Sequence, residues 1–183
     1  MRLLRTAGLL LTLMLVGCSG PAIEHYAAEQ PRLELADYFK GELQAWGMFQ
    51  NRSGEVVKRF QVVMTGTWQD DDHGVLDERF TYSDGTTERR VWTLKRQADG
   101  TWRGTADDVV GEAIGEVAGN ALHWRYVLRL RVDDATYLVD FDDWMYLLDD
   151  GVMLNRAHMS KWGVGLGDVT LSFFKPVRSG LAD

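Results

Sequence analysis

Apolar and polar residues alternate with a period of two over much of the chain. The alternation is clearest over residues 121–132, where one face is apolar and the other basic: Trp124, Tyr126, Leu128 and Leu130 against Arg125, Arg129 and Arg131. This period is typical of a strand that packs one face on a core and leaves the other in water. After residue 17, no stretch sustains the spacing of an amphipathic helix for long, so the pattern predicts an all-β domain.

Turn signals divide the alternating runs at short intervals. Ser83-Asp84-Gly85-Thr86 is a strong hairpin signal, because Asp-Gly readily supplies the positive φ angles of a tight turn. A first strand is predicted after Tyr38, and the others fall within residues 55–68, 75–82, 87–96, 102–110, 121–132, 136–143, 151–161 and 168–175. Consecutive hairpins favour a single up-and-down antiparallel β-barrel of about eight to ten strands, which also removes exposed sheet edges.

Three segments fit the strand pattern less well. Residues 27–40 and 143–148 are the best candidates for short helices. Gly111, Gly115 and Gly119 recur at equal spacing, but no Lys-Ser or Lys-Thr follows them, so they do not form a phosphate-binding loop. We expect these glycines to relieve crowding where strands bend or bulge.

The N-terminus has the layout of an export signal. Arg2 and Arg5 precede an apolar run over residues 7–16, which is shorter than the roughly 20 residues that span a bilayer. The run ends in Leu15-Val16-Gly17-Cys18, which resembles a lipobox, whose cysteine is acylated before cleavage. We therefore predict a lipoprotein signal peptide at residues 1–17, an acylated tether at 18–34 and the barrel domain at 35–183. The alternatives are an ordinary signal peptide with an accidental cysteine, or a buried apolar helix.

The single cysteine and the net charge indicate where the protein is located and which classes of partner it can bind. Cys18 is the only cysteine, so the exported domain would be stabilised by packing without disulfides. Ser19 follows it, and by resemblance to sorted lipoproteins this favours the outer membrane of a Gram-negative cell, facing the periplasm. Loss of Arg2 and Arg5 with the signal peptide takes the net charge from −7 to −9. An acidic domain repels nucleic acid and anionic lipid surfaces, so we expect no nucleic-acid partner and a membrane anchor made by acyl chains.

Several segments are distinctive in combination: Tyr38-Phe39-Lys40-Gly41, Ala45-Trp46-Gly47, and residues 78–85, 119–126, 140–145 and 155–161. In these segments, and over the chain from about Tyr38, the sequence resembles the DUF3833 family of bacterial lipoproteins. The resemblance implies a proteobacterial envelope protein of uncharacterised function. More loosely, the barrel is similar to lipocalin-like, calycin-type domains, but Ala45-Trp46-Gly47 departs from the Gly-x-Trp of lipocalins. Ligand binding is implied there only by analogy of fold.

The aromatic residues of the apolar faces are the main candidates for a binding site. Either they form a plain core, or they line a cavity for a lipid or other apolar ligand. Asn155, Arg156 and His158 are polar residues in an apolar neighbourhood, and they either line the same site or form structural hydrogen bonds. The predicted ligand-binding residues are Phe60, Phe80, Trp92, Trp124, Tyr126, Phe141, Asn155, Arg156 and His158.

Signals for catalysis, metals and cofactors are weak. The sequence contains no G-x-S-x-G motif and no H-x-x-x-H spacing, and we predict no cofactor and no metal site. Alternation places Asp140 and Asp142 on one side of a strand and Asp143 on the other, next to an acidic loop. The leading hypothesis is noncatalytic binding of a fatty acid, lipid or other apolar envelope ligand. The alternatives are a scaffold for another envelope protein and a hydrolase-type enzyme, which would need Asp142 and His158 to converge in one pocket.

Overall fold

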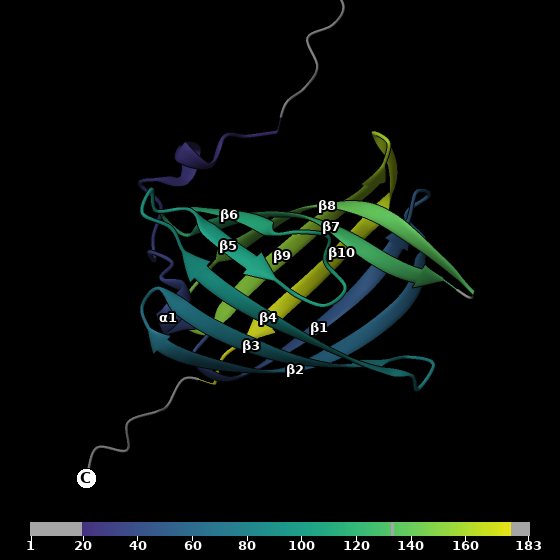
Figure 1. Ribbon diagram of the computed structural model, residues 1–183, viewed down its shortest axis with the longest axis horizontal. Coiled ribbons are helices and arrows are strands. Elements are labelled where there is room, and N and C mark those ends of the chain that lie inside the picture. The colour runs from purple at the N-terminus through teal and green to yellow at the C-terminus, as the bar shows by residue number, and fades with distance from the viewer. Residues whose placement is uncertain (1–19, 133, 177–183) are drawn as a thin grey trace, which may run out of the picture.

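The computed structural model describes residues 20–132 and 134–176, which form a closed antiparallel barrel (Figure 1). Each strand pairs with its neighbours in sequence, and the first strand closes the barrel by pairing with the last. The strands are β1 (Gly41–Asn51), β2 (Val56–Asp70), β3 (His73–Tyr82), β4 (Thr87–Arg96), β5 (Trp102–Thr105), β6 (Ala113–Ala118), β7 (Ala121–Val132), β8 (Ala135–Leu147), β9 (Val152–Lys161) and β10 (Val164–Phe174). The prediction of a single up-and-down barrel is confirmed.

The strongest alternating runs become strands at the expected positions. Residues 87–96 and 121–132 coincide with β4 and β7. Along β2, Phe60, Val62 and Met64 point inward and are buried, while the residues between them are exposed. Period-two alternation therefore separates the interior from the outer face, as it does in small closed barrels.

Two local predictions are wrong, and one strand was not predicted. Residues 143–148 do not form a helix, because alternation continues through β8, with Asp143 and Leu147 buried. The predicted strand at 102–110 is shorter, since β5 ends at Thr105. The segment with the spaced glycines contributes a strand of its own, β6, and its Gly115 lies against Trp124, whose indole ring an added Cβ would overlap.

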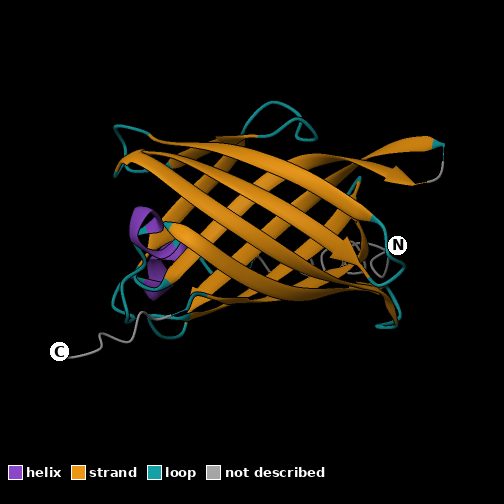
Figure 2. Ribbon diagram, turned by 90° about the horizontal axis from the view of Figure 1, so that it is seen from below, coloured by secondary structure: helices purple, strands orange, loops and turns teal. Residues whose placement is uncertain are grey.

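The segment before the barrel packs against one of its ends. The 3₁₀ helix η1 (Ile23–Tyr26) and the helix α1 (Leu35–Tyr38) both lie at this end, as Figure 2 shows. The Leu33 amide donates a hydrogen bond to the carbonyl of Gly119 at 2.8 Å, and both Ile23 and Leu33 are buried. Residues 23–34 therefore belong to the folded domain, and this corrects the prediction of a tether that extends to residue 34. The reason is apolar burial, since these side chains cover an end of the core that strands alone leave open.

The helix predicted over residues 27–40 shortens to the four residues of α1. Pro31 lies in the middle of that range and lacks the amide hydrogen that a continuous helix needs. Within the described ranges, none of the helices has the length and apolar character needed to cross a bilayer. Cys18 and the predicted signal peptide lie outside the described residues.

Candidate ligand cavity

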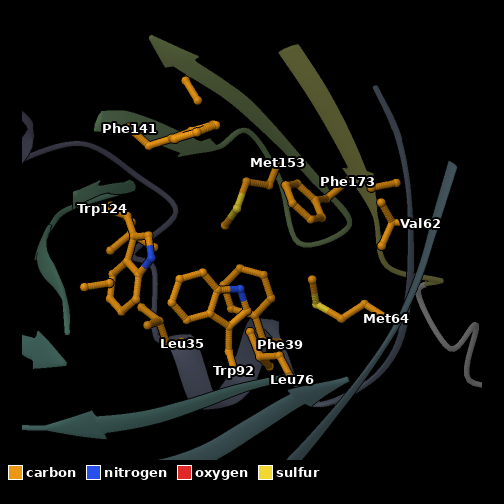
Figure 3. Packing of buried hydrophobic residues seen from close by; sticks show 14 of the residues in the cluster. Leu35, Phe39, Val62, Met64, Leu76, Trp92, Trp124, Phe141, Met153 and Phe173 are labelled. Carbon is orange, nitrogen blue, oxygen red and sulfur yellow. The ribbon is translucent and has the colours of Figure 1, made fainter. Parts of the chain in front are cut away.

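The barrel encloses a cavity of about 890 Å³. Leu35 of α1 and Phe39, the residue after it, line its closed end, whereas Gln50, Asn51 and Thr86 line it near the hairpins at the opposite end. Figure 3 shows side chains from several strands that surround this common interior, among them Trp92, Trp124 and Phe141. The cavity therefore runs through the barrel from a floor made by α1 to a rim of hairpins.

Aromatic rings form much of the cavity wall. Trp92 makes edge contacts with Trp124 and Tyr126, with ring centroids 5.6 and 5.4 Å apart. Tyr126 stacks on Phe141 at 4.9 Å. The six aromatic residues that the sequence singled out all line the cavity: Phe60, Phe80, Trp92, Trp124, Tyr126 and Phe141.

The polar group Asn155, Arg156 and His158 is divided between the two faces of β9. Asn155 is only 4% exposed and lines the cavity. Arg156 and His158 lie on the outer face, where both contact Asp168, at 3.5 and 3.0 Å. Successive positions such as 155 and 156 face opposite ways in a strand, so the three residues cannot form one site. This corrects the prediction that Arg156 and His158 line the cavity with Asn155.

The acidic residues of β8 divide as the alternation predicted. Asp140 and Asp142 are exposed, whereas Asp143 is buried and lines the cavity. Asp142 contacts His123 at 2.9 Å and lies opposite His158 in the β8–β9 register, so both partners are on the outer wall. The enzyme hypothesis required Asp142 and His158 to share a pocket, and neither lines the cavity. Within residues 20–132 and 134–176, no three His, Cys, Asp or Glu side chains are grouped as metal ligands.

Sequence reasoning missed a charged cluster inside the barrel. Arg90 of β4 bonds Asp108, with its Nη2 2.8 Å from Oδ2, and lies 4.0 Å from Glu78 of β3. Asp143 accepts a hydrogen bond from the Asn155 side chain. The signal was present in the alternation, because Glu78 and Arg90 occupy the same inward positions as the apolar residues of their strands.

Burial controls the protonation of the two deepest carboxyl groups. It raises the pKa of Glu78 to about 7, against the opposing effect of Arg90 and with a further increase from Asp108 and Asp143. Burial also raises the pKa of Asp143 to about 7, although its bond to Asn155 opposes the increase. Both groups therefore change protonation near neutral pH, unlike an ordinary carboxyl group in water.

These pKa values predict that the protein is more stable at pH 5 than at pH 8. The folded state takes up protons at Glu78 and Asp143 that the unfolded chain, with pKa values of 4.5 and 3.8, does not bind in this range. Stability is therefore highest at low pH and falls as the pH rises toward 7. We expect the free energy of unfolding, measured by urea titration, to be about 3–5 kcal/mol larger at pH 5, because each of the two groups contributes about 1.4 kcal/mol per pH unit between pH 5 and 7. The Glu78→Gln/Asp143→Asn double variant is the control, and an equally steep pH profile in that variant would assign the effect to other groups.

The Arg90–Asp108 pair also closes the side of the barrel. β4 pairs with β5 only from Thr93 onward, and β6 pairs with β7 only as far as Arg125. Residues 106–112 bridge the remaining gap through single contacts, including the Arg129 amide bonded to the carbonyl of Asp108 at 2.7 Å. A small cavity of about 280 Å³ adjoins this gap, lined by Glu88, Arg89, Arg90, Val91, Asp107 and Asp108.

Comparisons with known proteins give a family without an assigned activity. The family model described as "Protein of unknown function (DUF3833)" matches residues 12–175. No curated protein matches the chain.

Solved structures similar to the chain include designed and natural proteins. A de novo designed fluorescence-activating β-barrel has 10% identity and a TM-score of 0.42, with 78% of this chain and 98% of that chain covered. The design EF1p2_mFAP2b bound to DFHBI has 11% identity and a TM-score of 0.42, with 78% and 97% covered. A DUF3598 protein of unknown function from Nostoc punctiforme has 13% identity and a TM-score of 0.49, with 81% and 51% covered.

Proposed function

The chain belongs to the DUF3833 family, and we propose that its barrel binds a lipid or another amphipathic small molecule without transforming it. The observation that carries this proposal is the cavity of about 890 Å³, whose wall is made mainly of aromatic and aliphatic side chains. Sites for small molecules usually measure about 300–1,000 Å³ and combine apolar walls with a few polar groups. The interior has this composition, because Asn155 and the charged cluster of Glu78, Arg90, Asp108 and Asp143 lie among apolar residues.

The hairpin end of the barrel supplies a route for an apolar chain. Large apolar side chains near this end are exposed, and Trp162 is 89% exposed at the tip of the β9–β10 hairpin. The others are Val56, Val57, Val132, Tyr137, Leu138, Val164 and Leu166. An apolar ligand that leaves a membrane or micelle would stay in contact with apolar surface as it enters the cavity.

The predicted lipid anchor agrees with this role. Acylation at Cys18 would hold the barrel beside a membrane, the source of apolar and amphipathic molecules. We propose an outer-membrane location facing the periplasm on the sequence grounds given above, and this remains a prediction. A scaffold that binds another envelope protein through its exposed rim remains the alternative.

Filling the cavity from the wall should remove binding while leaving the fold intact. Ala157 of β9 is 2% exposed and lines the cavity, so Ala157→Trp places an indole in the ligand's space. We expect the affinity of the full-length protein for the neutral probe N-phenyl-1-naphthylamine to fall at least about tenfold, as measured by fluorescence titration.

Leu154→Trp is the matched control, because Leu154 is on the outer face of the same strand. This variant should bind the probe like the parent, and circular dichroism would verify that both variants fold. A parent protein that does not bind, or equal binding by the parent and both variants, would refute the proposal.

A further inference from the structure

The middle of the cavity contains more carboxyl groups than positive charges. Glu78, Asp108 and Asp143 line it there together with a single guanidinium group, that of Arg90. Four other charged side chains line the cavity: Lys58, Glu88, Arg129 and Arg131. Lys58 and Glu88 are bonded to partners of their own. Arg129 and Arg131 are at outward positions of β7, and Arg129 donates a hydrogen bond to a backbone carbonyl. An incoming polar group therefore meets an acidic interior.

Arg90 is already engaged, so its charge is not free for a ligand. Its Nε and Nη2 lie 2.9 and 2.8 Å from Oδ2 of Asp108. An anionic ligand would have to compete with this carboxylate for the guanidinium group. Because this partly buried pair is already formed, breaking it would cost about as much free energy as a new anionic partner for Arg90 could restore.

Asp143 and Glu78, in contrast, offer acceptor oxygens to the cavity. Asp143 is 6% exposed, and only its Oδ1 takes part in the bond from Asn155. Glu78 Oε2 is 4.0 Å from Arg90 Nη1, which is beyond hydrogen-bond distance. The side-chain hydrogen-bond donor to Glu78 is Trp92, which lowers the pKa of Glu78 and leaves other acceptor positions of the carboxyl group free. Two carboxyl groups that face a ligand-sized space with unused acceptors suit a donor that carries positive charge.

Aromatic rings accompany these carboxyl groups. Trp124 is directly opposite Asp143 in the β7–β8 register, and Trp92 follows Arg90 at the next inward position of β4. Tyr126 completes the group through its edge contact with Trp92 at 5.4 Å. Aromatic faces attract cations, and a wall that combines such rings with carboxylates is suited to an ammonium group.

We propose that the cavity selects amphiphiles whose polar end is an ammonium group and disfavours carboxylate amphiphiles with the same chain. This inference rests on the proposed function, because it assigns the ligand class of the same cavity. The ammonium group lies between Glu78 and Asp143, and the chain extends along the aromatic and aliphatic wall. An alkyl carboxylate would add a further negative charge beside three carboxyl groups, which is tolerated only if Glu78 and Asp143 are protonated.

The test compares three ligands with one chain length. Dodecylammonium, dodecanol and dodecanoate displace N-phenyl-1-naphthylamine from the full-length protein at pH 8, with the two ionic ligands below their micelle concentrations and dodecanol below its solubility limit. We expect dodecylammonium to bind at least about tenfold more tightly than dodecanoate, with dodecanol between them. The Glu78→Gln/Asp143→Asn variant should lose this preference, so that dodecylammonium and dodecanoate bind with affinities within about threefold of each other. The Asp140→Asn/Asp142→Asn variant, altered on the outer face, should keep the preference.

A second measurement uses the parent protein alone and does not depend on any variant folding. Calorimetry in two buffers with different ionisation enthalpies should show that protons are released when dodecylammonium binds, because the cation lowers the pKa values of Glu78 and Asp143. Equal or tighter binding of dodecanoate, or proton uptake with dodecylammonium, would overturn the ammonium proposal and leave ligand binding intact. Failure of all three ligands and of the probe to bind would instead overturn the proposed function.

Discussion

Replacing Arg90 by methionine should lower the free energy of unfolding by about 3–5 kcal/mol at pH 8. The substitution keeps an unbranched chain of similar length but removes the positive charge among Glu78, Asp108 and Asp143. One buried and two partly buried carboxyl groups, Asp143, Glu78 and Asp108, then face one another without a counter-charge, and a desolvated charge that loses its partner is strongly destabilising. Urea titration followed by tryptophan fluorescence measures the loss.

The same experiment at lower pH separates electrostatics from packing. Protonation of Glu78 and Asp143 removes most of the repulsion, so the loss in Arg90→Met should shrink as the pH falls from 8 to 5. Arg89→Met is the matched control, because Arg89 is the adjacent residue on the outer face, bonded to Asp77 at 2.9 Å. An exposed pair of this kind contributes little to stability, because water and salt screen it. Equal losses in the two variants, or a loss in Arg90→Met that does not change with pH, would contradict this account.

Arg90 also has a structural role in the barrel wall. It joins β4 to residues 106–112 in the region where β5 and β6 are too short to complete the ladder. In the methionine variant this join is lost at the place where the side cavity lined by Arg90, Val91 and Asp108 adjoins the main one. The charged cluster therefore stabilises the closed wall as well as setting the chemistry of the interior.

The fold could be predicted from the sequence because one face of each long strand is apolar. β7 shows this best, since its inward aromatic and aliphatic residues alternate with outward positions that include Arg125, Arg129 and Arg131. β6 was missed because Gly115 contributes no side chain to the pattern. The Trp124 ring of β7 occupies the space that a side chain at position 115 would need. The N-terminal segment was misread because the burial of Ile23 and Leu33 depends on the open end of the barrel, which local sequence does not reveal.

The residues of the site could be predicted only in part, because alternation identifies inward apolar residues but not inward charged ones. The six aromatic residues follow the alternation and line the cavity, so periodicity was sufficient for them. Arg156 and His158 were grouped with Asn155 by composition, although adjacent positions of a strand face opposite ways. Glu78 and Arg90 were overlooked because charged residues are ordinarily exposed. Asp108 lies in a loop, where no period predicts that its carboxylate turns toward Arg90.

The closed end of the barrel depends on a glycine in β2. Gly66 is buried below the residue that follows α1, and a Cβ added there would overlap the carbonyl oxygen of Phe39. Phe39 is 3% exposed, and its ring packs edge-on against Phe173, with centroids 6.2 Å apart. The obstructing atom belongs to the backbone, so no side-chain rotation can relieve the overlap. α1 would have to move away from the barrel as a unit.

Gly66→Ala should therefore cost about 3 kcal/mol of stability, near the upper end of what overpacking usually costs. Displacement of α1 would also raise hydrogen exchange at the amides of Tyr38 and Phe39, which bond the carbonyls of Glu34 and Leu35. Gly165→Ala is the matched control, because its Cβ would meet only the His158 ring, which can rotate into solvent. Its stability should change by less than about 1 kcal/mol. If Gly66→Ala were as stable as Gly165→Ala and kept its amides protected, α1 would not be held against Gly66, and the cavity would not have the floor described above.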